Sequence, residues 1–118
     1  MTERLTRLER IRGEKDFRSL YRTGRRVRGR YFDLVFRPNG LGYCRLGVVV
    51  SKKVGPAVAR NKVKRRMREL FRRNKSLYAD PVDVIVVSRP GIVGLARDEL
   101  EAEYLRAVAS TGRNRTPG

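Results

Sequence analysis

Histidine is absent from the 118-residue sequence, and cysteine occurs once. Without histidine, imidazole general-base catalysis and histidine metal sites are excluded. A lone cysteine, Cys44, excludes an internal disulfide and thiolate metal clusters, and it fits a small buried residue in a reducing cytoplasm. The acidic residues are scattered or gathered late in the chain, and no pair of them flanks a glycine-rich loop. The sequence therefore predicts no catalytic residue of its own.

Long apolar runs are also missing. No stretch is long enough to span a bilayer, and the first residues, MTERLTRLERIRG, lack the apolar centre of a signal peptide. We therefore expect a cytoplasmic protein. The hydrophobic residues make up 40% of the chain and come in patterned blocks, which suits one compact domain. We expect this domain over residues 13–109, between a basic arm at 1–12 and a flexible tail at 110–118.

Negative charge is scarce. Lysine and arginine together number 29, aspartate and glutamate 12, so the formal net charge is +17. A small domain with this charge repels itself unless a counter-charge is present. Nucleic acid is therefore the expected partner, ahead of an anionic membrane surface.

Hydrophobic periodicity predicts the first half of the fold. Phe17, Leu20 and Tyr21 lie on one face of a short helix over 13–24, with Asp16 as its expected cap. Alternating residues predict strands over 31–40 and 44–53. Phe32, Leu34 and Phe36 share one face of the first strand, and Leu46, Val48 and Val50 share one face of the second. With a short strand near 26–30, these segments would form a meander.

The second half begins with a long helix over 54–76, with Pro56 near its first turn. Its apolar stripe consists of Val63, Met67, Leu70 and Phe71. Residues 82–88 are apolar on both faces, which predicts a central strand. A final helix over 95–110 is expected to turn Leu100, Tyr104, Leu105 and Val108 inward. The order of elements predicts an α+β fold, a two-layer sandwich whose crossover should be right-handed on general grounds.

Residues 52–75 contain eleven basic residues and one acid. At about 100° per residue, Arg60, Lys64 and Arg68 form one row of the long helix, with Asn61 and Arg65 in the next row outward. Like charges at i,i+4 spacing destabilise a helix unless an anion compensates them. Arginine also suits phosphate because its fork can donate two hydrogen bonds. The pattern favours a binding surface over a solvated face, opposite a final helix that gathers acids.

Phe17 and Tyr21 lie one helical turn apart and allow two interpretations. They are either core aromatics of a short amphipathic helix or rings that stack on unpaired bases in a groove. The residues alone leave both interpretations open.

The stretch SKKVGPAVARNKVKRRMRE, residues 51–69, resembles the signature of the protein subunit of bacterial ribonuclease P. Matching positions in this sequence are Ser51, Lys52, Lys53, Gly55, Ala57, Arg60, Asn61, Lys64, Arg65, Arg68 and Glu69. The flanking segments DFRSLYRTG, RYFDLVFRPN and DVIVVSRPG are similar to the family as well, and the resemblance covers about residues 8–108.

The resemblance implies an α/β sandwich with an unusual left-handed crossover, against the general rule. It implies a large catalytic RNA and precursor tRNA as partners, with no membrane and no need for a protein oligomer. The holoenzyme would remove the 5′ leader, with the chemistry carried by the RNA and by Mg²⁺ held mainly by the RNA and substrate. The protein would bind the leader and aid substrate and Mg²⁺ affinity.

Site residues carry over from the resemblance in two groups. The surface on the catalytic RNA would comprise Arg60, Asn61, Lys62, Lys64, Arg65 and Arg68, with Lys62 where the family has a second arginine. The cleft for the leader would comprise Phe17, Tyr21, Val35, Val49 and Lys53, with Arg60 near its boundary. Val35 stands at a position that is often aromatic in relatives.

Two other functions remain as alternatives. Composition alone would favour a ribosomal-type protein that binds structured RNA without processing it. A DNA-binding architectural protein is the second alternative, and competition between duplex DNA and structured RNA would distinguish it.

Overall fold

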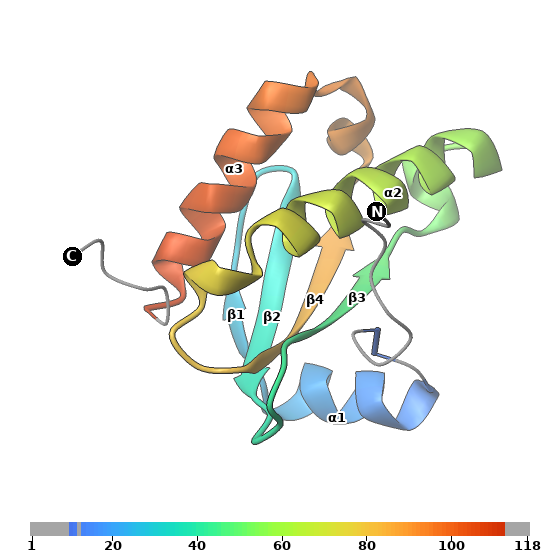
Figure 1. Cartoon of the computed structure of the whole chain (residues 1–118). Helices are drawn as coiled ribbons and strands as arrows, with labels where there is room; N and C mark the ends of the chain where they lie inside the picture. Colours follow the sequence, from blue (N-terminus) through green and yellow to red (C-terminus); the bar gives the residue numbers. More distant parts are fainter. Residues whose placement is uncertain (1–9, 12, 113–118) are drawn as a thin grey trace, which may run out of the picture.

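The computed structural model describes residues 10–11 and 13–112, which form a four-stranded sheet and three α-helices (Figure 1). The elements in chain order are α1 (Glu14–Thr23), β1 (Arg25–Val27), β2 (Phe32–Pro38), β3 (Arg45–Val49), α2 (Ala57–Arg73), β4 (Val82–Ser88) and α3 (Arg97–Ser110). Short 3-10 helices η2 (Lys52–Val54), η3 (Lys75–Leu77) and η4 (Pro90–Gly94) lie in the connections. The predicted α+β class is confirmed. The predicted arm and tail fall mostly outside the described residues.

The strands are ordered β1-β2-β4-β3 across the sheet. β2 is antiparallel to both β1 and β4, whereas β3 is parallel to β4, and α2 makes the crossover between this parallel pair. The predicted meander over 31–53 is wrong, because β4 lies between β2 and β3. Alternation identifies the two faces of a strand but not its neighbour in the sheet. The handedness of the crossover stays a prediction.

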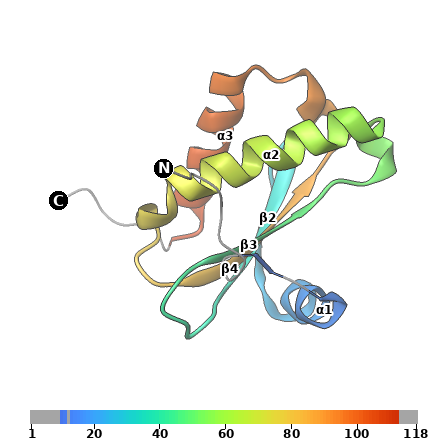
Figure 2. The ribbon, with the colours of Figure 1, turned by 45° about the vertical axis from the view of Figure 1, so that its right-hand side comes forward.

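The main core lies between one face of the sheet and the helices α2 and α3 (Figure 2). The predicted faces of the strands are confirmed here, since Phe32, Leu34, Phe36 and Leu46 all belong to this core. The apolar stripe of α2 packs on them through Val63, Met67, Leu70 and Phe71. From α3, Leu100, Tyr104 and Val108 are buried as predicted, but Leu105 is 38% exposed.

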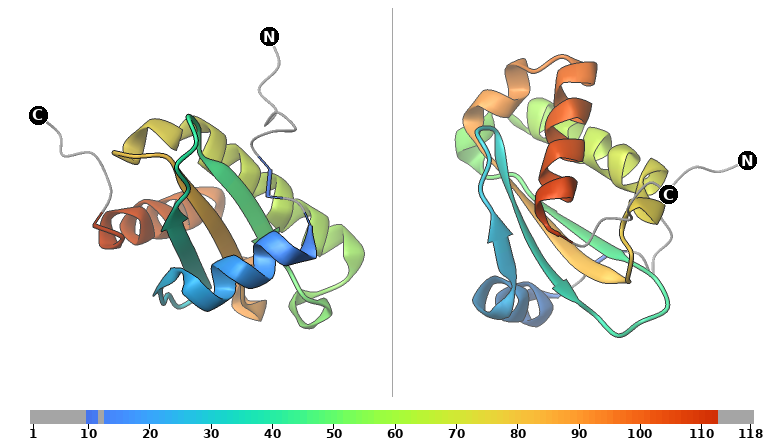
Figure 3. Two further views of the ribbon diagram at one scale, coloured as in Figure 1. Left: turned by 90° about the horizontal axis from the view of Figure 1, so that it is seen from below. Right: turned by 90° about the vertical axis from the view of Figure 1, so that its left-hand side faces the viewer.

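α1 covers the opposite face of the sheet and runs across the strands (Figure 3). Its Leu20 is buried against Val35 of β2 and Ile85 of β4. The expectation that Asp16 caps this helix is wrong: the helix begins at Glu14 with no side-chain cap, and the Asp16 carboxylate lies 3.8 Å from the Arg45 guanidinium. Gly24 ends the helix as expected, donating its N–H to the Leu20 carbonyl.

Arg10 and Ile11, which precede α1, complete this arrangement. Ile11 is buried in the same cluster and donates its N–H to the Leu46 carbonyl at 2.9 Å, so these two residues lie along the free edge of β3. In the described part of the chain, no helix has the length and apolar character needed to cross a membrane.

A buried carboxylate fixes the far end of the α1 face. Asp83 of β4 is 2% exposed, and Arg45 of β3 donates to it twice, at 2.8 Å from Nε and 2.6 Å from Nη2. Asn39 adds a third hydrogen bond at 2.9 Å. A buried carboxylate is tolerated only when such partners replace its water. This cluster therefore ties β3, β4 and the end of β2 together.

Asp83→Asn tests this role. We expect the free energy of unfolding to fall by about 2–3 kcal/mol, because charge-assisted hydrogen bonds to Arg45 are lost. Urea denaturation at fixed ionic strength measures it. The matched control is Asp80→Asn, which removes an exposed carboxylate and should change stability by less than about 0.5 kcal/mol. Equal losses in the two variants would mean that only net charge matters.

Candidate nucleic-acid interface

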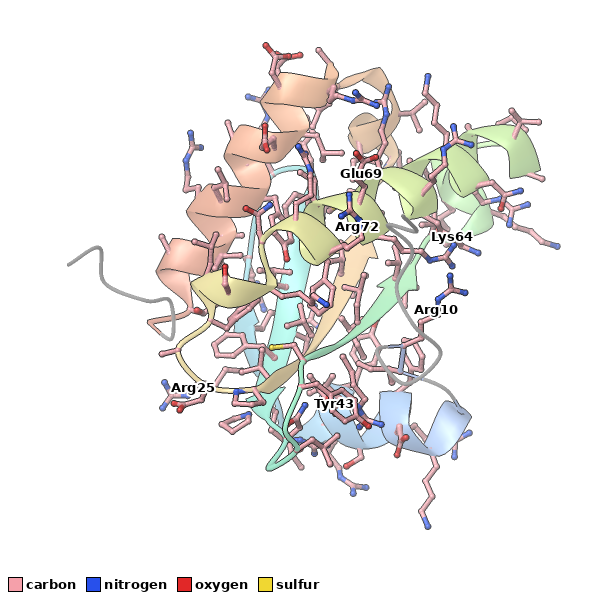
Figure 4. The ribbon with its side chains drawn as sticks, in the orientation of Figure 1. Arg10, Arg25, Tyr43, Lys64, Glu69 and Arg72 are labelled. Carbon is pink, nitrogen blue, oxygen red and sulfur yellow. The ribbon has the colours of Figure 1, made fainter. Side chains whose placement is uncertain are left out.

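The outer face of α2 carries the residues that the sequence predicted for RNA binding. Asn61, Lys62 and Arg65 are exposed, and Lys64 and Arg68 are half-buried beside the apolar stripe. Figure 4 shows Lys64 and Arg72 on the side of α2 away from α3. The helix therefore presents a polar, basic surface on one side and packs its stripe on the sheet with the other.

Acids do not neutralise this face. On the side towards α3, Arg73 pairs with Glu101 at 3.3 Å and Arg66 donates to the Leu95 carbonyl at 3.2 Å. Within the part of the chain that the structure describes, Lys62, Lys64, Arg65 and Arg68 have no such ion pair. Arg60 donates to the Gly55 carbonyl at 3.1 Å, which fixes the start of the row.

Strand register defines a second surface on the α1 face. Three rows of side chains run across β2, β4 and β3: Arg37, Asp83 and Arg45; Val35, Ile85 and Gly47; and Asp33, Val87 and Val49. α1 covers the middle row, because Leu20 packs on Val35 and Ile85. Val49 and Val87 in the last row remain half-buried. We call Phe17, Tyr21, Val49 and Val87 the apolar strip.

Phe17 and Tyr21 hold different positions within this strip. Phe17 is half-buried over Gly47, where an added Cβ would lie 2.6 Å from the phenyl Cζ, so only glycine allows this close approach. Tyr21 is 38% exposed, and the Arg26 guanidinium lies 5.7 Å from its ring centre. Partial burial raises the pKa of the Tyr21 hydroxyl above its usual value. Phe17 thus has a structural role as well as an accessible part, whereas Tyr21 presents much of its ring to solvent.

A charged cluster, missed by sequence reasoning, bounds the strip at its β1 end. Asp33 is 4% exposed and accepts from Arg26 at 3.0 Å and from Arg89 at 3.0 Å. The Gly29 N–H also donates to this carboxylate. These partners come from β1, from the β1–β2 loop and from the residue after β4. Arg89 is far from the other two in sequence, and their meeting at Asp33 follows from the register of the strands. The strip therefore has arginine side chains at one end.

The structure brings most of the predicted cleft residues to one face, with one difference. Phe17, Tyr21 and Val49 belong to the strip, and Lys53 is exposed on η2 just beyond β3. Val35 is 1% exposed because α1 lies on its row. It can support the floor of the surface from below but cannot contact a chain lying on it. Val87, which sequence reasoning did not include, stands next to Val49 in the exposed row.

The fold and these two surfaces define a class, that of basic α+β proteins suited to a polyanion. One side of the sheet carries a helix whose basic face lacks acidic partners among the described residues, and the other side carries the apolar strip with its two aromatic rings. The comparisons with known proteins agree with this class. The family model described as Ribonuclease P matches residues 5–112. The ribonuclease P protein component of Thermotoga maritima is 47% identical over 89 residues, covering 75% of this chain and 76% of the relative.

Solved structures give the same result. The ribonuclease P protein of Staphylococcus aureus has a TM-score of 0.83 and 31% identity, covering 91% of this chain and 98% of that one. The Thermotoga maritima protein has a TM-score of 0.79 and 35% identity, covering 86% and 96%. The chain belongs to the family of bacterial ribonuclease P protein components, subunits of an endoribonuclease that processes precursor tRNA together with the ribonuclease P RNA.

Proposed function

We propose that the outer face of α2 binds the ribonuclease P RNA and that the apolar strip binds the 5′ leader of precursor tRNA. One observation carries the first part: Lys62, Lys64, Arg65 and Arg68 face outward without acidic partners among the described residues, while Arg66 and Arg73 of the same helix are engaged on the α3 side. A helix that leaves these basic side chains unpaired while Arg66 and Arg73 pack towards α3 is suited to an external polyanion. Arg60 and Asn61 extend this face towards η2.

The leader is assigned to the strip because an unpaired strand exposes flat bases and a charged backbone. Bases can stack on the accessible parts of Phe17 and Tyr21 and lie on Val49 and Val87, each stacked base contributing about 1–3 kcal/mol. Arg26 at one end and Lys53 at the other can neutralise phosphates. Such contacts are tolerant of sequence, which suits leaders that differ between precursors.

The protein contributes binding to this reaction, and the RNA contributes the chemistry. The described residues contain no group of three or more side chains of the types that ligate metals. The buried carboxylates of Asp33 and Asp83 are each held by arginine. These residues do not fit a resident metal site, so we propose that Mg²⁺ is held mainly by the RNA and its substrate. Neutralising RNA phosphates would let that ion bind at lower concentration.

Cleavage of precursor tRNA at low Mg²⁺ tests the proposed function. Catalytic RNA alone should cleave slowly, and adding this protein should stimulate cleavage and lower the Mg²⁺ requirement, because the protein neutralises phosphates that otherwise demand the cation. The 5′ end of the product, mapped by primer extension, must match that of mature tRNA. RNA binding without stimulation would instead favour the ribosomal-type alternative.

Arg65→Ala tests the α2 face. We expect association with the catalytic RNA to weaken by about 1–3 kcal/mol, as for a charge-assisted hydrogen bond, and helix stability to be kept because alanine is a good helix former. The slope of log K against log salt should also fall by about one, the loss of one phosphate contact. Filter binding at several salt concentrations measures both quantities. Arg106→Ala on α3 is the control, and an unchanged slope for Arg65→Ala would show that the face is misassigned.

Phe17→Ala tests the strip. Substrates with long leaders should lose more affinity than leaderless tRNA, by about 1–3 kcal/mol for one stacked base. Because Phe17 also packs over Gly47, circular dichroism must first confirm that the variant is folded. The control is Leu105→Ala, which removes an exposed apolar side chain from α3. Equal losses for both substrates would remove Phe17 from the leader contact.

A further inference from the structure

A pocket of about 120 Å³ opens at the free edge of β3, between the chain before α1 and the helix α2. Arg10 lines it from the docked segment and Arg68 from α2, while Phe17 and Gly47 form part of its wall. Among the described residues, no carboxylate lines it. Figure 4 shows the Arg10 side chain and Lys64 of α2 extending into the same region in front of β3. The pocket therefore joins the two surfaces described above.

The two arginines stand near each other without a compensating acid. Across the described residues, neither Arg10 nor Arg68 makes an ion pair, and the buried Arg10 Nε has no hydrogen-bond partner. Burial, and then the charge of Arg10, lower the pKa of the Arg68 guanidinium below its usual value. Two cations held together in a partly desolvated place repel each other, and an orphaned buried donor adds a further cost.

A bound anion would remove both the repulsion between the two guanidinium groups and the cost of the unpaired Nε donor. A phosphate group offers acceptors to the forks of two arginines and can satisfy the free Nε donor. It would also tie α2 to the segment that carries Arg10, which otherwise meets β3 through the Arg10–Leu46 bridge and the Ile11 hydrogen bond. We propose that Arg10 and Arg68 together bind one phosphate of an RNA backbone in this pocket and thereby fasten residues 10–11 to α2.

That the phosphate comes from an RNA rests on the proposed function, whereas the ability of the two arginines to bind a phosphate does not. Phe17 belongs both to the apolar strip and to the wall of the pocket. A leader strand that leaves the strip over Phe17 would bring a phosphate here. So would catalytic RNA that extends past Lys64 from the α2 face. The chemistry is the same in both cases, so experiment must separate the two sources.

The first arm titrates the full-length protein with inorganic phosphate, at constant ionic strength set with chloride, and follows backbone amides by NMR. The Ile11, Gly47 and Val48 amides should shift together and saturate. Arg10→Gln and Arg68→Gln should each weaken this binding by about tenfold or more, as expected for a lost charge-assisted bond. Arg25→Gln on β1, at the other edge of the sheet, removes the same charge and should leave the affinity within about twofold.

Folding is checked in the same samples. Without phosphate, Arg10→Gln and Arg68→Gln should unfold at or above the wild-type temperature, because each removes one of two repelling charges. With phosphate, the wild type and Arg25→Gln should gain more thermal stability than either pocket variant, by ligand linkage. The double variant should lose little more phosphate affinity than the worse single variant, because both arginines hold one anion. Affinities for phosphate that are equal in all variants would overturn the proposal.

The second arm measures binding of catalytic RNA and of precursor tRNA with long and short leaders. Because Arg68 also belongs to the α2 face, Arg10→Gln is the decisive variant: its loss in the catalytic-RNA assay assigns the phosphate to that RNA, and its loss confined to long leaders assigns it to the leader. Either result supports the proposal, and wild-type behaviour in both assays overturns it. If Arg65→Ala still weakens RNA association in that last case, the proposed function stands and only the pocket assignment fails.

Discussion

The central position of β4 is the constraint on which the rest of the structure depends. Its neighbours are β2 and β3, and six of its seven residues, all but Val87, are buried, so the sheet needs cover on both faces. The helices α2 and α3 cover one face with a large core, whereas among the described residues α1 and Ile11 cover the other. Ten residues of helix running across the strands cannot cover every row. The row of Asp33, Val87 and Val49 lies at the edge of the area that α1 covers. Val49 and Val87 therefore stay partly exposed and form the apolar strip together with Phe17 and Tyr21.

The distribution of acids explains why the positive charge gathers where it does. Folding uses two carboxylates inside the sheet, Asp33 and Asp83, each satisfied by arginine because burial would otherwise be too costly. Other acids lie on α3, where Glu101 holds Arg73. Little negative charge is left for the outer face of α2. Residues 52–75 alone hold eleven of the 29 basic residues, and under the proposed function an RNA that meets this face would release counterions when it binds.

The sequence predicted local features well and long-range ones poorly, for a physical reason. The hydrophobic periods of 3.6 residues in a helix and 2 residues in a strand depend only on residues close in sequence. The apolar stripe of α2 and the core faces of β2 and β3 were therefore predicted correctly. Strand order depends on contacts between distant segments, and the meander was therefore wrong. The same limit applies to the site. The α2 residues come from one helix and could be predicted from its sequence, whereas Arg26, Val87 and Arg89 join the strip only through register. The resemblance assigned Val35 to the cleft, but nothing local in the sequence indicates that α1 covers it.

A single strand connects the two proposed binding surfaces and keeps them in fixed relation. β3 carries Gly47 under Phe17 and Val49 in the strip, and it then leads through η2 directly into α2. Because β3 is paired along its length with the buried β4, it cannot slide without breaking both cores. The distance from strip to helix face is thus set by the sheet. Under the proposed function, the protein would direct cleavage by holding the substrate's leader at a constant distance from the catalytic RNA, and the rigid element for this would be the parallel pair of β3 and β4.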